Sequence, residues 1–215
     1  MKSSEIRNLF KNSRKLWITC LIALSLVSGS ATIIYQKGKS GNSGTYQVDI
    51  ENSRVFWRLD AHSGIIPILE GKLNFMNDNL SDAFIKVHMD SLRNLDIDYK
   101  LMRIVLENTI KSKEVFETQR YPYAYFRLYT SEMVAADSLH VTGDLEIKEI
   151  ENCISFKTAV NFGQNQVKIN TDTINIDRIR WGIIAMSKDF ATGEEAYIIS
   201  NNFQLQISLA GKAVQ

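Results

Sequence analysis

The sequence predicts a mainly β fold, because apolar and polar residues alternate through most of the chain. The alternation recurs in segments that span residues 54–60, 83–89, 123–128, 139–147, 154–162, 167–176 and 203–209. Since successive side chains of a strand point to opposite faces, each strand would have one buried face and one solvated face. Many such strands in one small domain hide their apolar faces and sheet edges by closing into a barrel or packing as a sandwich.

Length and charge limit the functions that the chain can have. Of the 215 residues, 25 are Lys or Arg and 24 are Asp or Glu, which gives a formal net charge of +1. A net charge so near zero gives no overall field to attract nucleic acid, so we expect no nucleic-acid partner. Once the N-terminal 45 residues are set aside, about 170 remain, enough for one domain with a core.

The N-terminal region has the pattern of a membrane anchor. Residues 1–15 form a basic flank, residues 16–35 carry no charge, and residues 36–45 form a polar Gly/Ser linker. An uncharged run of this length matches a transmembrane helix, and the basic flank would stay in the cytoplasm. The domain at 46–209 would then be anchored on the periplasmic side of the bacterial inner membrane.

A cleaved signal peptide is the alternative reading of the same region. Residues 16–27 would serve as its apolar segment, and Gly29, Ser30 and Ala31 offer small residues for cleavage. Against cleavage, the apolar run continues through residues 32–35. Both readings export the domain, which would be soluble in the periplasm if the N-terminus were removed.

The strand pattern is interrupted once, between residues 92 and 121. Apolar residues at 101, 102, 104, 105, 106 and 110 predict an amphipathic helix lying on the barrel, with Asp98 as its N-cap. Asp96 and Asp98 could be considered as a catalytic carboxylate pair. Capping and turn formation explain them better, because Asp side chains readily bind nearby backbone N–H groups.

Residues that would indicate an enzyme are absent from the sequence. His62, His88 and His140 are scattered without metal-ligand spacing, and there is no G-x-S-x-G, P-loop or G-x-G-x-x-G motif. Cys153 falls on the predicted outer face of its strand, without a neighbouring histidine. We therefore expect no enzymatic activity; an enzyme would need a polar cluster inside the barrel.

Four segments, in order along the chain, resemble the YceI-like family. Tyr46–Trp57 resembles its Y-x-(I/V)-D…S-x-(I/V)-x-F opening, and Ser112–Phe126 resembles S-x-x-F-F-D-x-x-K-Y-P-x-A-x-F. Residues 141–147 resemble V-x-G-x-L-x-I, and residues 176–183 resemble I-D-R-x-x-F-G-I. Residues 148–152 depart from the family's R-G-V-T-K-P turn. The resemblance covers about residues 46–209.

The resemblance implies a single eight-stranded antiparallel, lipocalin-like barrel with an elongated apolar interior. Members of the family are exported bacterial proteins, and some bind polyisoprenoid chains such as isoprenoid quinones. It implies no covalent cofactor, and an isoprenoid or fatty lipid as the ligand. The family's strand register places a first set of candidate ligand-contacting residues on the inner face: Val55, Trp57, Leu59, Phe75, Val87, Met89, Phe126, Leu128, Phe156, Ile176, Phe203 and Leu205. The same register turns further residues inward: Leu73, Ile85, Ala124, Ile154, Ile174 and Ile207.

Two readings of this interior stay open. The apolar residues could line a cavity for a lipid, or they could simply fill a core. In the second case the barrel would be an envelope interaction module, with Tyr121, Tyr123 and Tyr125 as an aromatic stripe, and a homodimer is also open. The volume of the interior separates the two, since ligand pockets usually measure roughly 300–1,000 Å³.

Overall fold

The computed structural model describes residues 41–190 and 198–214. The basic flank, the membrane segment and most of the linker predicted from the sequence lie outside these residues. Within the described part of the chain, no helix combines the length and apolar character needed to cross a membrane.

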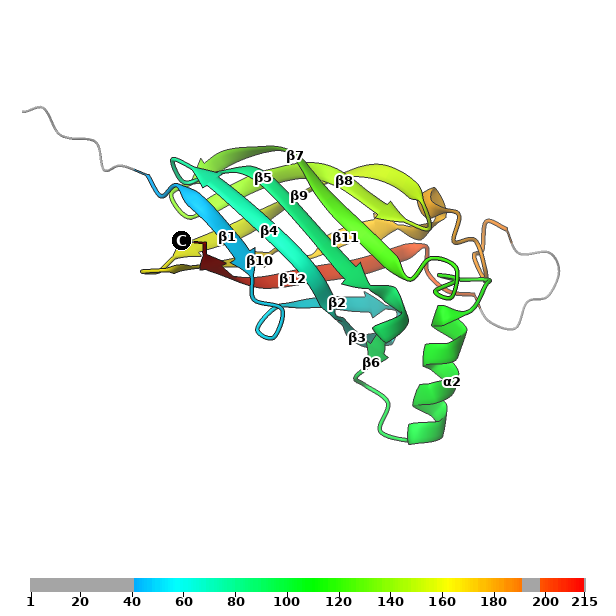
Figure 1. The fold of residues 1–215 in the computed structure, drawn as a ribbon. Helices are drawn as coiled ribbons and strands as arrows, with labels where there is room; N and C mark the ends of the chain where they lie inside the picture. Colours follow the sequence, from blue (N-terminus) through cyan, green and yellow to red (C-terminus); the bar gives the residue numbers. More distant parts are fainter. Residues whose placement is uncertain (1–40, 191–197, 215) are drawn as a thin grey trace, which may run out of the picture. The chain divides into compact units, whose positions relative to one another are not determined.

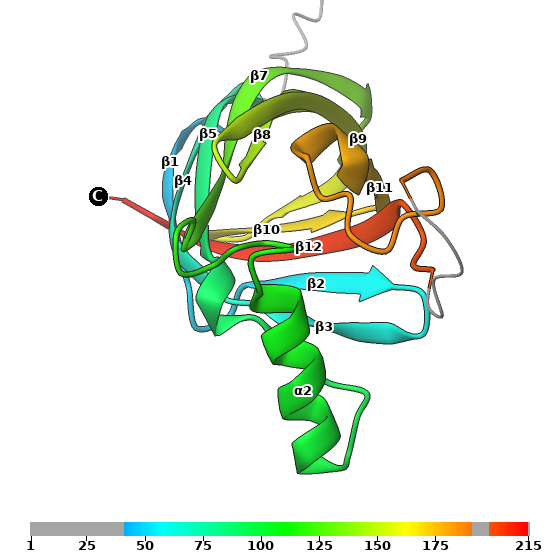
Figure 2. The same ribbon diagram turned by 90° about the vertical axis from the view of Figure 1, so that its right-hand side faces the viewer.

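Eight antiparallel strands close into a barrel, as the sequence predicts (Figures 1 and 2). Around the ring the strands are β1 (Gly44–Val48), β4 (Ile68–Met76), β5 (Asn79–His88), β7 (Tyr123–Ala135), β8 (Ser138–Ile147), β9 (Ile150–Phe162), β10 (Gln166–Thr171) and β12 (Asn202–Ala213). Antiparallel pairing of Tyr46 with Ala213 and of Val48 with Gly211 joins the first strand to the last. Because β1 and β12 pair with each other, neither strand has a free edge along these residues.

The N-terminal half of β12 extends beyond the closed ring and carries further strands. On one edge it pairs with β2 (Arg54–Leu59), which continues to β3 (His62–Ile66) and β6 (Arg93–Asn94). On its other edge it pairs with β11 (Ile174–Asp177). The sequence predicts one strand over 167–176, but the structure divides it into β10 and β11. Thr171 is the last paired residue of β10, and β11 resumes the pairing with β12 at Ile174.

The alternation of the sequence reappears as alternating burial along the strands. In β8, every second residue from Leu139 to Ile147 is buried. Gly143 lies within this strand at a close approach, since a Cβ there would stand 2.5 Å from a ring carbon of Phe126. The glycine therefore gives the Phe126 ring room inside the barrel.

Within residues 41–190 and 198–214, the helical elements are the two short 3-10 helices η1 (Met89–Ser91) and η2 (Arg178–Trp181) and the α-helix α2 (Lys100–Lys111). Trp181 of η2 is fully buried and donates a hydrogen bond from Nε1 to the carbonyl oxygen of Leu145, at 3.0 Å. This contact holds the segment after β11 against β8.

The orientation that the sequence predicts for the helix is wrong. We expected the apolar face of residues 101–110 to lie on the barrel, but Figure 2 shows α2 projecting away from it. The exposed fractions of Leu101, Met102 and Val105 are 60%, 57% and 59%. Ile110 is buried and Leu106 packs partly against the core.

Polar contacts explain this orientation. A carboxylate oxygen of Glu107 accepts a hydrogen bond from the backbone N–H of Asn94, at 2.8 Å. The Arg103 guanidinium donates to the carbonyl oxygen of Ile97. These bonds turn the charged side of the helix toward residues 94–97, so the apolar side faces solvent. The predicted N-cap is also wrong: Tyr99 occupies that position, without a side-chain capping bond.

Candidate functional site

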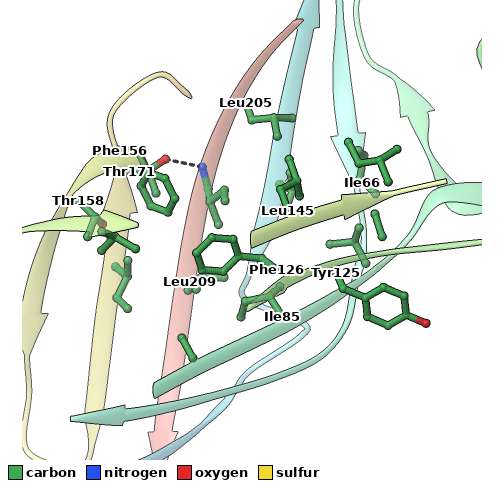
Figure 3. A pocket seen from close by; sticks show the side chains of 18 of the residues that line it. Ile66, Ile85, Tyr125, Phe126, Leu145, Phe156, Thr158, Thr171, Leu205 and Leu209 are labelled. Carbon is green, nitrogen blue, oxygen red and sulfur yellow. Dashed lines mark hydrogen bonds between the residues drawn. The ribbon is translucent and has the colours of Figure 1, made fainter. Parts of the chain in front are cut away.

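An apolar cavity of about 90 Å³ lies inside the barrel (Figure 3). Side chains from every strand of the ring except β1 form its wall, together with residues from β2, β3 and η1 and with Phe116 from the segment after α2. The wall consists of Val55, Ile66, Leu73, Leu80, Ala83, Ile85, Val87, Met89, Phe116, Ala124, Tyr125, Phe126, Val141, Leu145, Ile147, Phe156, Thr158, Ile169, Thr171, Phe203, Leu205, Ile207 and Leu209.

The few polar side chains of the wall have partners in the protein or point away. Thr158 Oγ1 donates to the carbonyl oxygen of Asn170 at 3.0 Å, and Thr171 Oγ1 accepts from the backbone N–H of Ile207 at 2.9 Å. The Tyr125 ring points away from the other lining side chains in Figure 3. A polar ligand group would lose its hydration here without gaining a ready partner, so the wall favours an apolar guest.

Aromatic pairs narrow the cavity. The rings of Phe126 and Phe156 lie 5.7 Å apart between centroids, at an interplanar angle of 56°. Phe116 meets Phe203 at 5.9 Å in an edge-on contact. Trp57 stacks on the same Phe203 ring at 6.4 Å. The Phe116 contact joins the segment after α2 to the wall of the cavity.

A second aromatic cluster lies toward the opposite end of β12. Phe75 contacts Phe162 at 4.9 Å and Tyr46 at 5.8 Å, both edge-on. Phe203 stands near the start of β12, whereas Tyr46 pairs with Ala213 at its end. The Phe75 cluster is therefore separate from the Phe116–Phe203 contact along the barrel.

The structure places the candidate residues in three groups. Those that line the cavity are Val55, Val87, Met89, Phe126, Phe156, Phe203 and Leu205. Trp57, Phe75 and Ile176 are buried in the core but are not part of the wall. Leu59 and Leu128 are only partly buried and pack against the core from outside the wall.

Several lining residues are not among the candidates taken from the sequence. They are Ile66, Leu80, Ala83, Phe116, Tyr125, Val141, Leu145, Ile147, Thr158, Ile169, Thr171 and Leu209. The alternation within 139–147 could have identified Val141 and Leu145, since they share one face of β8. Phe116 belongs to no strand, and only its family motif pointed to it.

Asp96, one of the two carboxylates considered as a catalytic pair, is held by hydrogen bonds from other segments. Asp96 accepts hydrogen bonds from the backbone N–H of Ser63 and from the Asn94 amide, and its carboxylate lies 2.9 Å from His62 Nδ1. Burial alone would raise the pKa of the Asp96 carboxyl, but the hydrogen bonds from His62, Ser63 and Asn94 together lower it. Asp96 therefore ties β3 to the segment after β6, so its main partners lie across the fold and not only in the local turn that the sequence predicts.

The remaining reactive side chains lie apart from the cavity. Cys153 is exposed, which confirms its predicted outer position. His88 Nδ1 lies 2.5 Å from Ser91 Oγ, and the carboxylate of Asp90 accepts a hydrogen bond from the Thr118 hydroxyl. Among residues 41–190 and 198–214, no group of three His, Cys, Asp or Glu side chains could hold a metal ion.

Arg178 has a structural role in the described chain. Its guanidinium donates to the carbonyl oxygens of Ile183, Ser200 and Ile199, at 2.6, 2.9 and 3.2 Å. Burial lowers the pKa of this side chain, because it disfavours the charged form. The residue joins η2 to the start of the segment that leads into β12.

The fold and the cavity define a class of protein: a small closed antiparallel barrel with an apolar interior. The model of the YceI-like domain matches residues 46–210, and the chain therefore belongs to this family, as the sequence motifs predicted. No curated protein matches the chain in a sequence comparison.

Solved structures with the same fold include three bacterial proteins. BcnA of Burkholderia cenocepacia has a TM-score of 0.62 at 16% identity, covering 76% of this chain and 98% of its own. A polyisoprenoid-binding domain from Saccharophagus degradans, implicated in plant cell wall breakdown, has a TM-score of 0.57 at 15% identity, covering 79% and 98%. The Campylobacter jejuni YCEI protein has a TM-score of 0.53 at 13% identity, covering 74% and 85%. At these identities the likeness shows the fold.

Proposed function

We propose that the barrel binds a long apolar lipid, of the isoprenoid type, in its interior. The observation that carries the proposal is a cavity wall whose polar side chains are already bonded or turned away. Membership of the YceI-like family and the fold shared with a polyisoprenoid-binding domain support the same class of ligand. Each buried CH₂-sized group would contribute roughly 0.8 kcal/mol to binding.

The cavity requires the ligand to be slender and the wall to move. Its volume of about 90 Å³ is below the roughly 300 Å³ at which ligand pockets usually begin. Phe126 and Phe156 both line the cavity and contact each other. We propose that these rings separate when a lipid enters.

The proposal includes the place where the protein acts. The basic flank and uncharged run at residues 1–35 support export of the barrel to the periplasmic side of the inner membrane. There the protein would sequester or carry its lipid without chemical conversion.

The test is direct extraction of the ligand. The full chain is purified from native membranes in mild detergent and extracted with organic solvent. Mass spectrometry then identifies and quantifies the lipid in the extract. We expect one isoprenoid lipid at near-stoichiometric amount. If no lipid accompanies the protein, and the protein also fails to take up an added isoprenoid quinone, the proposal is wrong.

The small volume supports a second candidate, an interaction module with a filled core. Tyr123 and Tyr125 lie on the outer face, where the Lys86 ammonium stands 4.0 Å from the Tyr123 ring centroid. Aromatic side chains of this kind are common in protein interfaces. Absence of lipid together with a stable protein complex that Tyr123→Ala disrupts would favour this function.

A further inference from the structure

One part of the cavity wall belongs to neither a strand nor a helix. Residues 112–118, which we call the strap, follow α2, and Phe116 of the strap lines the cavity and contacts the Phe203 ring. Figure 2 shows the chain between α2 and β7 at the end of the barrel that faces the viewer. Phe116 is only 6% exposed, so the strap covers the cavity at this end.

The strap is not paired with the barrel through its backbone. Within residues 41–190 and 198–214, its backbone N–H groups donate to the carbonyl oxygens of residues 109–112, as Phe116 does to Ile110 at 3.2 Å and Thr118 to Lys111 at 3.1 Å. Each strand of the ring, in contrast, is hydrogen-bonded to both of its neighbours. Parting two strands would leave several backbone groups without partners, whereas lifting the strap breaks no backbone hydrogen bond to the barrel.

Side-chain hydrogen bonds join the strap to the elements around it. The Lys148 ammonium, in the turn between β8 and β9, donates to the carbonyl oxygen of Val115 at 3.0 Å. The Thr118 hydroxyl donates to the Asp90 carboxylate of η1 at 2.8 Å. Lys148 forms no ion pair in the part of the chain that the structure describes, so its charge is directed to the strap.

The turn that carries Lys148 has an unusual backbone. Lys148 and Glu149 join β8 to β9, and both have a positive φ, of 54° and 60°. Two-residue hairpin turns of this kind favour Asn and Gly, because other side chains are strained in the left-handed conformation. The strain is retained at the residue whose ammonium binds the strap, which points to a function of this contact.

The opposite end of the barrel offers a harder entrance. There Tyr46, Phe75 and Phe162 pack against one another, and none of them lines the cavity. A guest that entered at that end would have to displace three mutually packed rings, all carried by strands of the ring. At the strap it would displace Phe116, which moves with a segment that has no strand pairing.

We propose that the strap is the movable cover of the cavity: it lifts away from the barrel, together with Phe116, to admit a guest, and the Lys148 hydrogen bond holds it closed. The end of α2 and Pro122 bound the moving segment. The Pro122 carbonyl oxygen accepts from the backbone N–H of Met89 at 2.9 Å, which fixes the chain where β7 begins. The identity of the guest rests on the proposed function, whereas the motion itself can be tested without a lipid.

The experiment measures how often the strap opens, through a thiol in the cavity wall. In the full chain, Cys20→Ser and Cys153→Ser remove the native thiols, and Ala124→Cys places one in the wall at a position that is 3% exposed. Val167→Cys is the matched control, because Val167 is fully buried, is paired with Phe162 and lies outside the wall. N-ethylmaleimide modifies each thiol in mild detergent, and mass spectrometry follows the rate without added lipid.

We expect Lys148→Met to speed modification at position 124 roughly tenfold, the factor expected when a hydrogen bond to a charged group is lost. The rate at position 167 should change less than about twofold, because opening of the strap is local. Phe116→Ala should also speed modification at position 124 selectively. Lys157→Met, which removes an exposed lysine from the outer face of β9, should leave both rates as they are.

Two results would overturn the inference. Equal acceleration at both positions would mean that the substitutions loosen the whole barrel, and an unchanged rate at position 124 in Lys148→Met would mean that the strap is not the cover. Uptake of an isoprenoid quinone by the same variants separates this inference from the proposed function. Selective acceleration at position 124 without quinone uptake supports the strap and refutes lipid binding, whereas quinone uptake with no change at position 124 refutes the strap alone.

Discussion

Replacing Phe156 with alanine separates a lipid-binding barrel from a filled one. The ring lines the cavity and meets Phe126 at 5.7 Å, so its removal enlarges the space that a ligand would occupy. Truncating a fully buried phenylalanine to alanine lowers the free energy of unfolding by roughly 3–5 kcal/mol. Phe156 is only half-buried, so we expect a loss at the lower end of this range, about 3 kcal/mol. Urea denaturation of the lipid-free protein measures this change in the free energy of unfolding.

An added isoprenoid quinone should then restore the stability of the variant. A ligand at one hundred times its Kd contributes about 2.7 kcal/mol to the free energy of unfolding. Phe156→Ala should gain at least as much as the unsubstituted protein, because its rings no longer have to separate.

Phe75→Ala is the matched control for this substitution. Phe75 is buried in the same barrel but contacts Tyr46 and Phe162 outside the cavity wall. It should lose about as much stability as a buried phenylalanine, about 4 kcal/mol, without a larger response to the quinone. If Phe156→Ala is destabilised and the quinone stabilises neither variant nor the unsubstituted protein, the interior is a filled core and the reasoning fails.

Three further substitutions test other parts of the structure. Ala83→Leu should fill the cavity and block quinone uptake, seen by mass spectrometry, while changing the free energy of unfolding by less than about 1.5 kcal/mol. Arg178→Met leaves three carbonyl oxygens without their donor and should lower the free energy of unfolding by about 3 kcal/mol in urea; a loss below about 1 kcal/mol would contradict the structural role. The hydrogen bond from Lys212 lowers the pKa of Asp49 to about 2, so its stabilising effect is complete above the ordinary carboxyl pKa and is lost as the pH falls toward 2. Asp49→Asn should flatten the dependence of Tm on pH in this acid range, and an unchanged slope would refute the assignment.

The closed barrel could be predicted from the sequence because strand periodicity is a local property. Alternation in 139–147 and 154–162 requires only that neighbouring side chains face opposite ways, and both segments are strands in the structure. The number of strands came from the family motifs, since closure depends on pairing between distant residues such as Tyr46 and Ala213. Periodicity alone leaves a barrel and a sandwich open.

The helix shows what periodicity leaves undetermined. A helical repeat identifies an apolar face at 101–105, but it does not say what that face contacts. The orientation depends on hydrogen bonds of Glu107 and Arg103 with the backbone of residues 94–97. Those contacts join two segments whose pairing no periodic pattern predicts.

The candidate site shows a similar limit. Alternation tells which side of a strand faces inward, but not how far along the barrel each residue lies. Phe75 and Phe126 both face inward, yet Phe126 lines the cavity and Phe75 packs in the cluster with Tyr46. The height of each residue follows from the register of the whole barrel, which no single strand encodes.

A small cavity and a long apolar ligand are compatible if the cost of opening the wall is low. Separating the aromatic pair of Phe126 and Phe156 loses about 0.5–1.5 kcal/mol of ring contact. Burial of two CH₂-sized groups of a ligand, at roughly 0.8 kcal/mol each, already offsets this loss. The volume of the cavity without a ligand is therefore a weak argument against lipid binding. A stronger constraint on lipid binding is steric. The displaced rings must adopt another rotamer inside a barrel whose other wall positions are filled. Phe156→Ala removes one of the two rings and with it this constraint.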